Sequence, residues 1–158
     1  YASGSVGGAP TRRYHGLLVA ALKPPVDRTV MVAKLDVLAT YGGSAVPLST
    51  SEFADGTVAP DGHRHLAGFR LEGTVPVWTW LIGDALVEQR LWMPHGKNTT
   101  IVSFSLVRCS APLAIWCTSP RLRIIQSVRC AVAGHSCRSA RSTKRTILAH
   151  ASAVHAPP

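Results

Sequence analysis

The sequence predicts an all-β fold, an antiparallel β-sandwich, and two observations support that class. Short apolar runs alternate with turns rich in Gly, Pro, Asn and Asp over residues 1–115. No segment of that range combines helical periodicity with helix caps. The chain has 158 residues, 46% of them hydrophobic, which is enough for one domain with a buried core. Short strands joined by tight turns bury such a core between two facing sheets.

The first part of this range predicts two strands and a loop. Residues 16–22 form a short apolar run between Gly16 and Pro24, which predicts a buried strand. Residues 29–41 predict a longer strand with an irregularity near Ala33, where the apolar residues change sides. A Gly-Gly-Ser turn follows at 42–44. Residues 49–62, rich in Ser, Asp and Gly, predict mostly loop.

The second part predicts a series of antiparallel strands. Residues 65–71 and 75–82 flank Glu72-Gly73 and predict a hairpin, and residues 85–93 predict the next strand. In residues 99–107 the apolar side chains 102, 104 and 106 alternate with Ser103 and Ser105, which predicts a half-solvated sheet. Residues 113–115 predict only the beginning of a further strand.

The composition changes at residue 116. Residues 1–115 contain ten Lys/Arg and eight Asp/Glu, whereas residues 116–158 contain seven Lys/Arg and no acid, so the tail holds most of the net charge of +9. Because the tail shows neither a strand nor a helix period, we expect it to be a disordered basic tail. We interpret residues 116–158 as a non-family segment translated out of frame, which sequencing of the encoding DNA tests. The alternative is a nucleic-acid-binding tail.

The densest cluster of functional side chains lies at residues 11–16, Thr-Arg-Arg-Tyr-His-Gly. Arg12 and Arg13 offer forked donors suited to vicinal hydroxyls or a carboxylate. Tyr14 offers a ring that can pack on a sugar face, and His15 can donate or accept a hydrogen bond. The alternative is structural, with arginine paired to a neighbouring acid and the rings filling an interdomain seam. We take Arg12, Arg13, Tyr14 and His15 as the candidate substrate-binding residues.

Three further groups of residues have both a functional and a structural interpretation. Glu52, Asp55 and Asp61 could form the paired carboxylates of a glycosidase, but Asp before Gly more often forms turns. The two histidines at 63 and 65 would share one face of a strand without a third metal ligand in register. The two tryptophans at 78 and 80 also share a face, where they form either a sugar-stacking platform or part of the core.

These motifs resemble a known family. Residues 11–28, the blocks 48–56 and 60–66, the Pro-Val-Trp-Thr-Trp segment at 76–80 and the block 91–100 are similar to the N-terminal domain of bacterial and archaeal glycogen debranching enzymes, the amylo-alpha-1,6-glucosidase type. The resemblance covers residues 1–115. It implies a partial sandwich that belongs to a glucoamylase-like, galactose-mutarotase-like supersandwich. It also implies hydrolysis of alpha-1,6-glucosidic branch linkages in glycogen, by paired carboxylates of a separate α/α-barrel domain.

The sequence itself contains no such barrel and begins at Tyr1 rather than Met. We therefore expect an N-terminal domain fragment of a glycoside hydrolase, inactive alone, that supports the barrel and contacts glycogen or another alpha-glucan. An autonomous carbohydrate-binding module remains an alternative, which needs the two tryptophans at 78 and 80 exposed.

Partners and location follow from the remaining motifs. No pair of the four cysteines has C-x-x-C spacing, and no phosphate-binding loop is present, so we expect reduced thiols, no metal and no cofactor. No apolar stretch approaches the ~20 residues that a membrane span requires. We expect a cytoplasmic protein with no specific nucleic acid and no membrane as partner.

Overall fold

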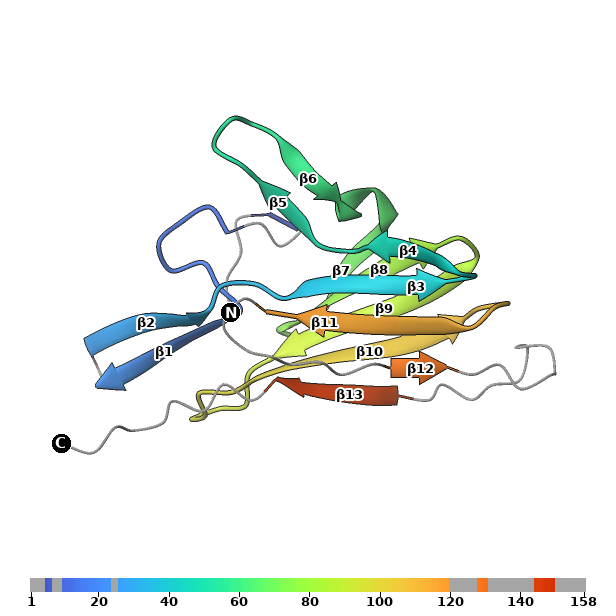
Figure 1. Ribbon diagram of the computed structural model, residues 1–158. Coiled ribbons are helices and arrows are strands. Elements are labelled where there is room, and N and C mark those ends of the chain that lie inside the picture. Colours follow the sequence, from blue (N-terminus) through green and yellow to red (C-terminus); the bar gives the residue numbers. More distant parts are fainter. Residues whose placement is uncertain (1–4, 7–9, 24–25, 120–127, 131–143, 150–158) are drawn as a thin grey trace.

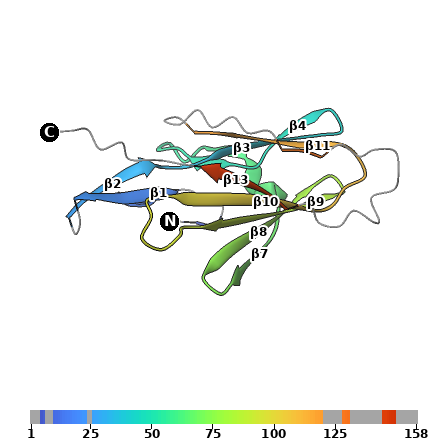
Figure 2. The same ribbon diagram turned by 90° about the horizontal axis from the view of Figure 1, so that it is seen from below.

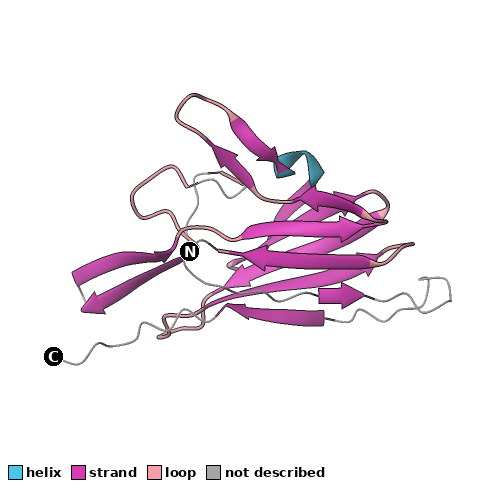
Figure 3. Cartoon of the chain, viewed as in Figure 1, coloured by secondary structure: helices cyan, strands magenta, loops and turns pink. Residues whose placement is uncertain are grey.

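The structure is a computed structural model that describes residues 5–6, 10–23, 26–119, 128–130 and 144–149. Figure 3 shows that most of these residues lie in strands. The strands are β1 (Leu18–Lys23), β2 (Val26–Val32), β3 (Asp36–Tyr41), β4 (Ser44–Pro47), β5 (Thr50–Glu52), β6 (Val58–Asp61), β7 (Leu66–Glu72), β8 (Val75–Ile82), β9 (Ala85–Trp92), β10 (Thr100–Arg108), β11 (Leu113–Thr118), β12 (Val128–Cys130) and β13 (Lys144–Ala149). The helix described among them is the 3-10 turn η1 (Gly62–His65). None of the described helices is long and apolar enough to span a bilayer.

The strands form two main sheets that face each other (Figure 1, Figure 2). One sheet has the order β13-β10-β9-β8-β7 and the other β12-β11-β3-β4. Two hairpins, β1-β2 and β5-β6, stand beside these layers. All pairings are antiparallel. The predicted all-β antiparallel sandwich is confirmed.

The core lies between the two sheets because their inner faces are apolar at every second residue. In β11 buried and partly exposed residues alternate strictly from Leu113 to Cys117. One continuous cluster joins both sheets; its main members are Val37, Ala39, Trp78, Trp80, Ile82, Val87, Leu91, Val102, Phe104, Leu113, Ile115 and Cys117. Burial of each large side chain contributes roughly 1.5–3 kcal/mol, so this interface supplies the main stabilisation of the fold.

Several predicted elements differ in detail from the observed ones. The strand predicted over residues 29–41 is two strands, because the chain leaves the β1-β2 hairpin after Val32 and enters the four-stranded sheet at Asp36. The segment 49–62, predicted as mostly loop, contains the β5-β6 hairpin. The strand begun at Leu113 continues to Thr118 and pairs with β3 along its length. Ser103 and Ser105 face away from the core as predicted, but they are buried, because the long side chains of their partners in β9 share that face.

Three segments of the basic tail lie in strands: residues 116–118 at the end of β11, β12 and β13. Strand β12 pairs with β11, and β13 pairs with β10 at the edge of the five-stranded sheet. The remaining tail residues after 119, to which the expected disorder also applies, lie outside the described residues. The boundary at residue 115 and the out-of-frame origin of the tail stay predictions.

Tyr41 connects the two sheets at one end of the sandwich. Its hydroxyl, at the end of β3, donates to the carboxylate of Asp84 in the β8-β9 turn. The same oxygen accepts from the backbone N–H groups of Ser110 and Ala111, each at 3.1 Å, in the β10-β11 connection. The hydrogen bonds from the side chains of Tyr41 and Ser110 lower the pKa of the Asp84 carboxyl group. One side chain therefore fixes two turns to the four-stranded sheet.

A close backbone contact holds the β5-β6 hairpin and η1 against the rest of the chain. Gly62 is buried, and its N–H donates to the carbonyl of Ser49 at 3.2 Å. A Cβ added at Gly62 would lie 2.4 Å from the carbonyl carbon of Leu48. Because the obstacle is backbone, no side-chain rotation relieves it.

We predict that Gly62→Ala destabilises the protein by about 1–3 kcal/mol, the usual cost of overpacking. The control is Gly68→Ala, because the nearest atom to an added Cβ there is Thr79 Cβ at 4.0 Å. That change should be neutral or slightly stabilising, since glycine in a strand costs conformational entropy. Urea-unfolding midpoints measure both effects, and equal midpoints for the two variants would contradict the prediction.

Candidate functional site

The loop formed by Arg12, Arg13, Tyr14 and His15, the Arg12–His15 loop, is a compact turn in front of β1. The N–H of His15 donates to the carbonyl of Arg12 at 2.9 Å. The N–H of Thr11 donates to His15 Nδ1 at 3.2 Å, and the Thr11 hydroxyl lies at the same distance from that nitrogen. Because Nδ1 accepts the backbone hydrogen bond, the neutral ring carries its proton on Nε2. His15 therefore offers a hydrogen-bond donor at Nε2.

The residues after the loop attach it to the core. Leu17 and Leu18 are buried. The carbonyl of Leu17 accepts a hydrogen bond from the Thr100 hydroxyl at 2.7 Å. The N–H of Leu17 donates to the carbonyl of Ala33 at 3.1 Å. A Cβ added at Gly16 would lie 3.0 Å from both Val30 Cγ1 and the Val32 carbonyl oxygen, so glycine permits this close approach to β2.

Arg13 and Tyr14 present their side chains to solvent as a pair. The guanidinium carbon of Arg13 lies 5.4 Å from the centroid of the Tyr14 ring, within cation–π range. Tyr14 is 45% exposed. Neither Arg12 nor Arg13 forms an ion pair with any residue that the structure describes. The structural alternative, in which these arginines pair with neighbouring acids, is therefore not what the described part of the chain shows.

The acidic block does not have the features of a catalytic carboxylate pair. Glu52 lies in β5, and Asp61 lies at the end of β6, 3.4 Å from Arg64 in an exposed ion pair. Asp55 accepts from the N–H of Thr57 at 2.9 Å, which lowers the pKa of its carboxyl group. A glycosidase acid needs a raised pKa, so Asp55 has the turn-forming role given as the alternative.

The histidines and tryptophans occupy structural positions. His63 and His65 lie in η1 rather than on a strand, and the described residues contain no group of three or more potential metal ligands. Trp78 and Trp80 are buried, 6% and 4% exposed. Their indole N–H groups donate to the Val6 carbonyl at 2.6 Å and to Gln89 Oε1 at 3.0 Å. The exposed platform that an autonomous carbohydrate-binding module requires is therefore not formed by these two residues.

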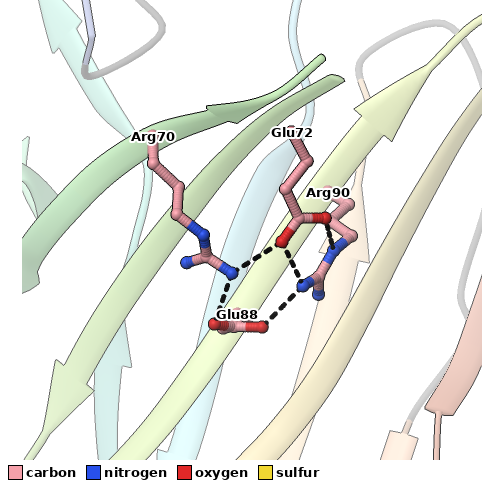
Figure 4. Close-up of polar contacts among 4 residues, drawn as sticks. All are labelled: Arg70, Glu72, Glu88 and Arg90. Atoms are coloured by element: carbon pink, nitrogen blue, oxygen red, sulfur yellow. Dashed lines mark hydrogen bonds and ion pairs between the residues drawn. The ribbon is translucent and has the colours of Figure 1, made fainter. Parts of the chain in front are cut away.

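The structure also contains a four-residue charge network that the sequence analysis did not identify. Arg70 and Glu72 of β7 reach over β8 to Glu88 and Arg90 of β9, on the face away from the core (Figure 4). The four ion-pair distances lie between 2.7 and 2.9 Å. The sequence does contain a signal for this network. Each of the two strands carries opposite charges two residues apart, and such residues share one face of a strand.

This network keeps its carboxylates ionised. The hydrogen bonds from Arg90 and Arg70 lower the pKa of Glu72 from the ordinary 4.5 to about 2. Burial opposes the charge on Glu88, but the hydrogen bonds from the same two arginines outweigh it and lower that pKa as well. Neither carboxyl group is suited to donate a proton near neutral pH, so the network is structural.

The buried Cys117 thiol is inert. Cys109 and Cys117 are both buried, and burial raises the pKa of Cys117 to about 12. The thiolate is the reactive form, so Cys117 is neither a nucleophile nor a ready metal ligand. The other two cysteines contribute no described side chain.

The charge network predicts a specific loss of stability in acid. Because the pKa of Glu72 is lower in the folded than in the unfolded state, its contribution is complete above about pH 4.5 and is lost as the pH falls towards 2. We predict that Glu72→Gln loses less stability across this interval than the unmodified chain. Glu52→Gln, which removes an acid outside the network, is the control. Urea midpoints between pH 5 and 2 test this, and parallel curves for Glu72→Gln and the unmodified chain would contradict it.

No curated protein and no solved structure matches the chain. The sequence model of one family, described as glycogen debranching enzyme N terminal, matches residues 1–145. The match includes the Arg12–His15 loop and extends past residue 115, into residues that the sequence analysis assigned to a non-family tail. Since the match covers most of the chain, the protein belongs to the family of glycogen debranching enzyme N-terminal domains.

Proposed function

We propose that this chain is part of the N-terminal β-sandwich of a cytoplasmic glycogen debranching enzyme, a glycoside hydrolase of glycogen catabolism. In this proposal the sandwich supports a catalytic α/α-barrel, which cleaves alpha-1,6 branch linkages, and is inactive alone. The Arg12–His15 loop contacts the glucan at the mouth of the barrel. The partners are the barrel domain and glycogen or a related alpha-glucan, with no specific nucleic acid and no membrane.

The observation that supports the proposed glucan contact is the exposed Arg13–Tyr14 pair. An arginine without an acidic partner in the described structure keeps its forked donors for a ligand. The partly exposed Tyr14 ring supplies an apolar face beside those donors. A pyranose ring presents the complementary groups, C–H bonds on its faces and hydroxyls around its edge. Gly16 and Leu17 anchor the loop to the core, so the loop would lose less conformational entropy when it binds a ligand.

Exposed apolar side chains support the proposed contact with a second domain. Leu71 and Phe69 of the edge strand β7 are 62% and 44% exposed. Val26, in the protruding β1-β2 hairpin, is 64% exposed. Edge strands and apolar patches of this kind are usually covered by another part of the protein, which suits a domain that packs against a barrel.

We predict that Arg13→Ala in an intact debranching enzyme carrying this domain lowers kcat/KM for a branched glucan about tenfold, the equivalent of ~1.4 kcal/mol. The thermal unfolding midpoint should not change, because Arg13 is exposed and outside the core. Arg28→Ala removes an equal charge from an exposed position on β2 and is the control. An unchanged kcat/KM for Arg13→Ala would refute the role of the loop.

A further inference from the structure

A pocket lies on the outer face of the four-stranded sheet, away from the Arg12–His15 loop in sequence. Its volume is about 380 Å³, within the range of small-molecule sites. The floor is a row of three side chains, because Leu38 pairs in register with both Trp116 and Pro47. Thr118 and Asp36, the next pair of β11 and β3, continue this floor.

The β5-β6 hairpin lies beside β4 (Figure 1). Its residues form the wall of the pocket. The hairpin contributes Ser51, Phe53 and Pro60. Phe53 is 55% exposed and Leu38 is 40% exposed, although both are large and apolar. Apolar side chains kept at the surface of a hollow are typical of a binding site.

The polar groups of the pocket carry no net charge. Lys34 and Asp36 are its charged lining residues, and Lys34 Nζ lies 2.8 Å from Asp36 Oδ1. Lys34 also donates to the Ser51 hydroxyl, which ties the wall to the floor. Both charged side chains remain partly exposed, 29% and 37%. The pocket thus offers donors and acceptors beside apolar surface, without attracting an ion of either sign.

We infer that this pocket binds a neutral saccharide, one or more glucose residues of an alpha-glucan chain. A pyranose has apolar faces for Trp116 and Phe53, and hydroxyls for Asp36, Lys34 and the serine and threonine hydroxyls. A charged ligand would have to break the ion pair, and a purely apolar ligand would leave Lys34 and Asp36 desolvated. The choice of an alpha-glucan rests on the proposed function, but the site shares no residue with the Arg12–His15 loop.

The test is calorimetric titration of the full chain with maltoheptaose and, separately, with cellohexaose. Phe53→Ala is the first variant, because an exposed side chain can be truncated without unfolding the protein. Asp36→Asn is the second, because it keeps the shape of the side chain. We expect each to weaken maltoheptaose binding about tenfold, the loss of one central contact. Val107→Ala, at an exposed apolar position outside the pocket, is the control and should bind as the unmodified chain does.

The outcomes separate this inference from the role of the loop. If both pocket variants keep full maltoheptaose affinity, or if the unmodified chain does not bind maltoheptaose, the inference that the pocket binds a saccharide is refuted. The proposed function is then still decided by the kinetics of Arg13→Ala. Weakened binding in the pocket variants, with normal affinity in Arg13→Ala, supports a separate site. Cellohexaose binding of equal strength overturns the assignment to alpha-glucan.

Discussion

The two sheets must bury their inner faces against each other, and this constraint orients the side chains of the strands in both. In a strand, consecutive side chains point to opposite faces, so a shift of one residue in register would exchange core and surface. Ile115 and Cys117 therefore point inward and place Trp116 outside. Trp78 and Trp80 point inward for the same reason and enter the core. Only the side chains that the core does not bury form the surface that ligands can reach.

Some charged side chains on the surface pair only with one another, whereas others keep hydrogen-bonding groups that a ligand could reach. The arginines and glutamates over β8 satisfy one another, with lowered carboxyl pKa values, and leave little capacity for a ligand. Lys34 and Asp36 also pair, but they do so at the edge of a hollow, where their remaining hydrogen-bonding groups stay accessible. Arg13 lies over the Tyr14 ring and pairs with no acid among the residues that the structure describes. Surface pairs in water contribute little to stability, so their arrangement matters mainly for what can bind beside them.

A debranching enzyme acts on a branched polymer that extends well beyond the scissile bond. Contacts with remote parts of such a substrate can contribute to the rate when they position the reacting bond. The proposed contact of the Arg12–His15 loop with glucan and the inferred saccharide site would both be contacts of this remote kind. The fold itself does not specify this role, because the same architecture serves many functions. The role depends on the side chains at the two surfaces.

The sequence by itself determined the fold class, most strand positions and the family, because alternation, turn residues and motifs are local properties. The hairpin of β7 and β8, the strands β9 and β10 and the compact loop at 12–15 follow from such patterns. Only the tertiary structure decided that the chain changes sheets after Val32, that the tryptophans at 78 and 80 are buried, and that Lys34, Phe53 and Trp116 line one pocket. These facts depend on contacts between residues far apart in the chain. Periodicity shows which residues share a face of a strand, but which face is covered, and by what, depends on how the sheets pack.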